Sequence, residues 1–182
     1  MKFTKTLLIA AVALLLASPS AAGNLRLFGS YWNTEDADEA VGFGVGTRLG
    51  RYFDLRATYY SDVTADTTPE HSDFEIQAIP LEAGFVFPFA ESANFNPYAG
   101  GGVSLVLLDI DGGEVNEELG FYGVLGAEFG DPDGVGFFAE AMYRQMEAKV
   151  RDDDDFDDVI IRDEVETALS GFAVNGGVVW RF

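Results

Sequence analysis

The chain has 182 residues, and its 11 Lys plus Arg stand against 31 Asp plus Glu, which gives a formal net charge of −20. A hydrophobic content of 48% is too high for a disordered acidic chain, and the length suits one domain. The sequence contains no cysteine, which excludes disulfides and cysteine nucleophiles. Its acidity argues against a nucleic-acid partner, because phosphates attract Lys and Arg.

The N-terminal segment, residues 1–22, has the pattern of a secretory signal peptide. Lys2 and Lys5 precede an unbroken apolar run over residues 7–17, and small residues at 20–22 suit cleavage before Gly23. This run of 11 apolar residues is shorter than the about 20 that a membrane-spanning helix needs, and charges or glycines interrupt every later apolar stretch. We therefore expect a cleaved signal peptide at residues 1–22 and a mature domain at 23–182, and a helical membrane protein is excluded.

The rest of the chain alternates between apolar and other side chains. Over residues 41–49 the apolar side chains share one face and the glycines share the other, which is the period of a β-strand. Eight such strands are predicted, at residues 24–33, 40–50, 53–61, 73–87, 97–109, 118–129, 135–149 and 167–182. In the fourth, the apolar positions change phase near Pro80. This predicts a bulge there, because proline cannot donate to a strand ladder.

The connections between the predicted strands alternate in character. The acidic connections are 34–39, 62–72, 110–117 and 150–166, and the shorter or plainer ones are 50–52, 88–96 and 130–134. Small membrane barrels combine long outer loops with short periplasmic turns. The pattern predicts an all-β fold, an eight-stranded antiparallel up-and-down transmembrane β-barrel with both termini on the periplasmic side.

The period alone does not decide whether the apolar face points to lipid or into a soluble core, so a soluble periplasmic barrel or sandwich stays an alternative. Three features favour lipid. A signal peptide occurs without disulfide-forming cysteines, charges of both signs lie at interior strand positions, and aromatic residues gather near strand ends. The aromatic residues concerned are Tyr52, Phe53, Phe85, Phe87, Phe129, Trp180 and Phe182.

The last predicted strand carries a resemblance to a known class of protein. Its alternate residues Phe172, Val174, Val178, Trp180 and Phe182 resemble the C-terminal assembly signal of bacterial outer-membrane proteins. Residues 96–102 resemble the strand-opening pattern of small barrels related to outer-membrane proteins A and X. The resemblance implies a monomeric barrel in the cell outer membrane, in contact with lipid and lipopolysaccharide and inserted by the barrel-assembly machinery. Neither motif specifies an activity.

A set of charged residues is predicted to face the lumen, namely Arg48, Asp54, Arg56, Glu82, Glu128, Glu140 and Arg144. Across the tight turn at 50–52, Arg48 is expected to face Asp54, and Leu49 to face Phe53. A buried charge must be paired, and an eight-stranded barrel is about filled by its own side chains. The set therefore predicts a salt-bridged plug. A narrow porin-like channel for small solutes is the alternative.

Acidic residues are concentrated in the predicted outer loops, with the densest run at 152–158. Carboxylates suit Ca²⁺ or Mg²⁺, but the spacing around Asp109 and Asp111 departs from the EF-hand loop, so we predict a solvated acidic surface without a metal site or cofactor. His71 and Ser72 leave a lipid A-modifying enzyme as a remote alternative, although adjacency in sequence is not a catalytic triad. We predict a structural or surface-interaction role, with no catalytic residues.

Overall fold

The computed structural model describes residues 23–34, 39–64, 75–90, 92, 94–110, 116–131, 133–150, 165–168 and 170–182. The strands in these ranges are β1 (Gly23–Thr34), β2 (Ala40–Leu49), β3 (Phe53–Thr64), β4 (Glu75–Pro88), β5 (Phe95–Ile110), β6 (Asn116–Gly130), β7 (Val135–Gln145), β8 (Glu147–Val150), β9 (Val165–Ala168) and β10 (Gly171–Arg181). Among the residues described, no helix is long and apolar enough to cross a membrane.

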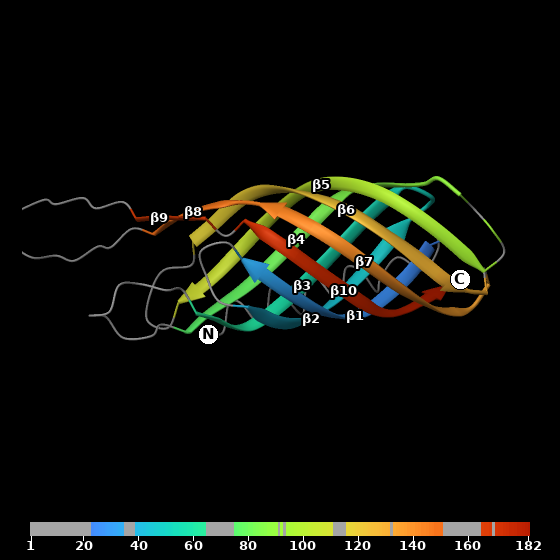
Figure 1. Cartoon of the computed structure of the whole chain (residues 1–182), viewed down its shortest axis with the longest axis horizontal. Helices are drawn as coiled ribbons and strands as arrows, with labels where there is room; N and C mark the ends of the chain where they lie inside the picture. Colours follow the sequence, from blue (N-terminus) through green and yellow to red (C-terminus); the bar gives the residue numbers. More distant parts are fainter. Residues whose placement is uncertain are drawn as a thin grey trace, which may run out of the picture.

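Eight of these strands close into an antiparallel barrel in the order β1-β10-β7-β6-β5-β4-β3-β2 (Figure 1). The first and last barrel strands meet along one seam, where Leu25 lies opposite Trp180. One end of the barrel, here called the turn end, carries the tight turns, the start of β1 and the end of β10, and Arg181 N donates to Gly134 O there at 2.9 Å. The opposite end is called the loop end. The predicted eight-stranded up-and-down barrel is confirmed.

Two predicted strands, 135–149 and 167–182, are interrupted in the structure. Each breaks near the loop end, at Met146 and Ser170, and the short strands β8 and β9 beyond the breaks pair only with each other in a separate sheet. This sheet projects past the barrel on the side away from the C-terminus (Figure 1). The Ser170 hydroxyl accepts from Met146 N at 3.1 Å and donates to Met146 O at 3.2 Å. The Ser170 side chain thus hydrogen-bonds to the backbone N–H and C=O of Met146, which would otherwise be free to bond to a neighbouring strand.

The bulge predicted at Pro80 is wrong. Along β4 and β5 the register is continuous, with Ile79, Pro80 and Leu81 opposite successive residues of β5. The irregularity lies between β3 and β4 instead, where the register shifts between Tyr60 and Val63. Ala78 therefore shares the buried lumen face with Pro80. The sequence interpretation failed because it took an apolar lumen residue for one that faces outward.

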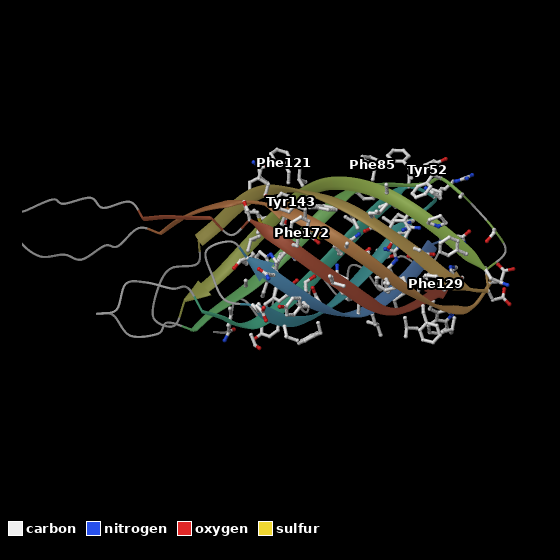
Figure 2. All side chains as sticks on the ribbon, in the orientation of Figure 1. Tyr52, Phe85, Phe121, Phe129, Tyr143 and Phe172 are labelled. Carbon is white, nitrogen blue, oxygen red and sulfur yellow. The ribbon has the colours of Figure 1, made fainter. Side chains whose placement is uncertain are left out.

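The outer surface of the barrel is apolar and bears aromatic side chains near both ends (Figure 2). Near the turn end, Tyr52 packs on Phe87, Phe53 on Phe85 and Phe95 on Phe129. Near the loop end, Phe43 packs on Tyr59 and Tyr143 on Phe172. Two such girdles are typical of barrels that cross a membrane, where they lie at the two interfaces. The apolar face therefore points outward and the other face into the lumen.

The lumen is not uniformly polar. Toward the loop end it holds buried, mainly apolar side chains, here called the apolar layer, namely Trp32, Ala40, Tyr60, Ala78, Met142, Met146 and Ala173. They belong to a larger buried cluster that continues toward the turn end through Val86, Tyr98, Val106, Tyr122 and Val124. Closer to the turn end the lumen contains charged side chains.

Glycines make room for the rings that fill this interior. A Cβ added at Gly42 would come within 2.6 Å of the Tyr60 ring, and one at Gly126 within 2.7 Å of the Tyr98 ring. Because real Cβ atoms do not approach other atoms so closely, only glycine leaves room for these rings beside the neighbouring strand.

Candidate functional site: the lumen ion-pair network

The charged side chains of the lumen form a network whose centre is Arg56. Arg56 donates to Asp54 Oδ2 from Nε at 3.0 Å and from Nη2 at 2.5 Å, and its Nη1 donates to Glu140 Oε1. Asn175 Nδ2 donates to the same Glu140 oxygen at 2.8 Å, and the Tyr98 hydroxyl donates to the other at 2.7 Å. Glu140 thus joins side chains from β3, β5 and β10 to β7.

Glu128 on β6 forms a second centre nearer the turn end. Its Oε1 lies 2.5 Å from Arg26 Nη2 and 3.2 Å from Arg48 Nη1, and its Oε2 lies 3.0 Å from Arg181 Nη2. Asp54 Oδ1 lies 3.3 Å from Arg26 Nη1 and 3.7 Å from Arg48 Nε. The two centres therefore share Asp54.

Arg144 on β7 forms a third centre, next to the apolar layer. Its Nε donates to Glu82 Oε1 at 2.8 Å, and its Nη1 donates to the Tyr60 hydroxyl at 3.2 Å. Its guanidinium carbon lies 5.1 Å from the centre of the Trp32 ring, within the range of a cation–π contact. Arg56 Nε lies 3.8 Å from Glu82 Oε2, so the third centre is connected to the first.

The structure brings together the seven charged residues that the sequence places in the lumen, since each is in contact with another member of the network. The register across the first turn is confirmed, with Arg48 opposite Asp54 and Leu49 opposite Phe53.

Sequence reasoning missed two arginines of the network, Arg26 and Arg181. The sequence did contain the evidence for Arg181, because the alternation of the last strand places it on the same inward face as Asn175. The alternation also places Tyr60 on the face of Asp54 and Arg56, but a tyrosine suits either face of a membrane barrel, so the contacts of Tyr60 and Tyr98 with the network were not predicted.

The charges in the described part of the lumen nearly cancel. The network holds five arginines and four carboxylates, namely Arg26, Arg48, Arg56, Arg144 and Arg181 with Asp54, Glu82, Glu128 and Glu140. Buried ions are tolerated only where opposite charges and hydrogen bonds replace water. Each carboxylate here touches at least one guanidinium, so the network meets that requirement from within the barrel.

The residues of the proposed C-terminal assembly signal share the outward face of β10. Phe172, Val174, Val178, Trp180 and Phe182 are all exposed on the barrel surface. Since β10 pairs with both β1 and β7, these side chains flank the seam at which the barrel closes.

Several sequence-based predictions lie outside the described residues. These are the signal peptide, His71 and Ser72, and most of the acidic connections. Within the part of the chain that the structure describes, no three His, Cys, Asp or Glu side chains are grouped so that they could hold a metal ion.

A closed antiparallel barrel with an apolar exterior and an ion-paired interior defines an outer-membrane β-barrel protein. Residues 7–182 match the outer membrane protein beta-barrel domain family, and the chain belongs to that family. No curated protein matches the sequence significantly.

Solved structures of outer-membrane proteins have the same fold. Neisserial surface protein A (NspA) is similar with 16% identity and a TM-score of 0.58, over 88% of this chain and 96% of that one. The outer membrane protein OprG from Pseudomonas aeruginosa is similar with 12% identity and a TM-score of 0.61, over 89% of this chain and 96% of that one. At these identities the likeness extends to the fold alone.

Proposed function

We propose that this outer-membrane protein is a closed barrel with a structural or surface-interaction role, which presents its acidic connections outside the cell and has no enzymatic activity. The observation that carries the proposal is the ion-pair network centred on Arg56, because it joins side chains from opposite walls of the barrel. A hydrated ion could pass only if several of these bonds broke together.

The apolar layer supports the same proposal. Trp32 and Met142 are almost completely buried inside the barrel, directly beyond the Arg144 centre. An apolar constriction opposes ions because it offers no groups to replace their hydration. The ion-paired and apolar parts of the lumen would therefore act as two barriers in series.

A narrow porin-like channel is the second candidate. It is favoured by the ionised side chains on the lumen wall, whose rotation would leave a polar path past Arg56 and Arg144. The two candidates differ in whether the resting network is closed.

The proposal includes the route by which the protein reaches its membrane. Residues 1–22 would be a signal peptide removed on export, and the outward face of β10 would be read by the barrel-assembly machinery. The mature protein would be a monomer, and its girdles would contact outer-membrane lipid and lipopolysaccharide.

The test is ion conductance of the refolded mature chain in a planar bilayer, with insertion verified by a heat-dependent shift on gels. We expect no steady openings from the native protein, and we expect openings when Glu140→Gln, which weakens the network, is combined with Trp32→Ala, which opens the apolar layer. Asp133→Asn, in the exposed turn between β6 and β7, removes the same charge outside the lumen and should stay silent. Steady openings of the native protein that change with Glu140→Gln would make it a channel instead.

A further inference from the structure

The hairpin formed by β7 and β10 is interrupted at the loop end without a change of register. On the barrel side of the interruption Arg144 lies opposite Gly171, and on the far side Glu147 lies opposite Ala168. Each strand advances by three residues between these two pairs, so the alignment of the strands is the same on both sides. The two-stranded sheet β8-β9, here called the ribbon, projects past the barrel (Figure 1). The interruption therefore breaks the ladder but inserts no residue.

No ladder connects the ribbon to the barrel. The pairing of β7 with β6 ends at Gln145 and Phe121, and the pairing of β10 with β1 ends at Gly171 and Thr34. Both pairings thus end next to the interruption, and among the described residues β8 and β9 pair only with each other. A change in the direction of the ribbon would therefore break no strand pairing of the barrel.

The residues at the interruption are fixed to the barrel by close packing. Met146 is 2% exposed and belongs to the apolar layer, and a Cβ added at Gly120 would lie 2.3 Å from its Cγ. A Cβ added at Gly171 would lie 2.1 Å from the carbonyl oxygen of Asn33 on β1. Ser170 is also buried. Because a close-packed interior leaves little room for movement, motion of the ribbon would be confined to the interruption itself.

The Ser170 hydroxyl bridges the interruption. It accepts from Met146 N at 3.1 Å and donates to Met146 O at 3.2 Å, across 24 positions of the sequence. The carbonyl oxygen of Gly134 faces β10, where it accepts from Arg181 N, and alternate residues of an antiparallel strand face the same neighbour. Met146 lies an even number of positions from Gly134, so its carbonyl oxygen faces the same side, where a continued ladder would supply a backbone donor. The hydroxyl thus competes with the ladder.

Ser92 makes the same pair of bonds in a different setting. Its Oγ accepts from Phe95 N at 3.1 Å and donates to Phe95 O at 2.9 Å, three positions along the chain in the exposed turn between β4 and β5. Those bonds close a local turn, whereas the bonds of Ser170 join two strands that are distant in the sequence. Of the two arrangements, only that of Ser170 can fix the direction of the ribbon relative to the barrel.

We propose that the interruption is a hinge with a latch. The ribbon turns as one body about Met146 and Ser170, and the Ser170 hydroxyl keeps it in one orientation. The sequence between β8 and β9 contains the densest acidic run, at 152–158, so the hinge determines the direction in which this connection is presented. The inference deepens the surface-interaction role proposed above and rests on it for the position of the ribbon outside the cell, whereas the hinge itself does not.

The first test measures distances between pairs of spin labels by pulsed EPR in lipid nanodiscs, which is direct because the sequence contains no cysteine. Thr167→Cys with Asp133→Cys joins the ribbon to the turn end, and Asn33→Cys with Asp133→Cys joins two exposed sites of the barrel. We expect Ser170→Ala to widen the ribbon distance distribution at least about twofold and to leave the barrel pair unchanged. Ser92→Ala, the matched control, should change neither.

An unchanged ribbon distribution in Ser170→Ala would overturn the latch. A native distribution that is already as wide as that of the variant would overturn it as well.

The second test separates turning of the ribbon from its unfolding by amide hydrogen exchange. In Ser170→Ala, exchange at Ala148 and Thr167, which lie opposite each other in the ribbon, should stay within about twofold of the native rate. Exchange that accelerates there as much as at Met146 would show that the ribbon unfolds, and would overturn the hinge. Steady conductance of the native protein would instead contradict the closed barrel and leave the hinge in place.

Discussion

Neutralising Glu140 tests how much the ion-pair network contributes to stability. Glu140→Gln preserves the shape of the side chain but removes its charge, and three hydrogen bonds from Arg56, Asn175 and Tyr98 converge on this carboxylate. A hydrogen bond to a charged group contributes about 1 kcal/mol more than one to a neutral group, so we expect a loss of about 3 kcal/mol in the free energy of unfolding. This value agrees with the about 3–5 kcal/mol lost when one partner of a buried ion pair is removed.

The assay is urea unfolding of the refolded protein in lipid vesicles, followed by tryptophan fluorescence under conditions in which unfolding and refolding curves coincide. Asp133→Asn, on the exposed turn, should change the free energy by less than about 0.5 kcal/mol. Asn175 lies directly opposite Glu140, so adding Asn175→Asp returns a carboxylate to the same region and should recover at least about 1 kcal/mol. A loss below about 1 kcal/mol for Glu140→Gln, or no recovery in the double variant, would refute the reasoning.

Three further perturbations have outcomes that the structure fixes. Gly126→Ala should lower the free energy of unfolding by about 1–3 kcal/mol in the same urea assay, because the new Cβ would lie 2.7 Å from the Tyr98 ring. Gly29→Ala, with no atom within 4 Å of its new Cβ, should have little effect, and equal losses would contradict this account. Ser170→Ala should speed amide hydrogen exchange at Met146 about tenfold, because a hydrogen bond of about 1.4 kcal/mol is lost. Unchanged exchange would show that Ser170 does not stabilise the interruption between β7 and β8. Val174→Arg, on the outward face of β10 between the two girdles, should cost about 2–4 kcal/mol, against about 0–1 kcal/mol for Trp180→Arg near the turn end. The reverse order would contradict this position of the bilayer on the barrel.

Much of the fold could be predicted because strand alternation is a local signal. Residues 41–49 alternate mainly between apolar side chains and glycines. The structure places β2 at Ala40–Leu49, one residue shorter than the predicted range 40–50. The register of Arg48 with Asp54 followed from the same alternation and from the shortness of the turn between them. Local pattern and turn length together determine which residues of a hairpin face one another.

The predictions that failed depended on contacts between distant residues. Met146 breaks its strand through Ser170, which is 24 positions away in the sequence, so no window around Met146 contains the cause. Ala78 and Trp32 are apolar yet face the lumen, because the layer next to the loop end is packed rather than hydrated. The partners of the charged residues were equally hidden, since Arg26 contacts Glu128 across 102 positions.

The three arginines that meet Glu128 have a consequence for how the protein is made. They come from β1, β2 and β10, so the carboxylate on β6 has all its guanidinium partners only when the beginning and the end of the barrel are both in place. A barrel missing its last strand would lack the two hydrogen bonds from Arg181 to Glu128 and the one from Asn175 to Glu140, each of which contributes about 1.5–3 kcal/mol. The closed barrel is therefore more stable than one that lacks its last strand, and closure of the seam completes the network inside.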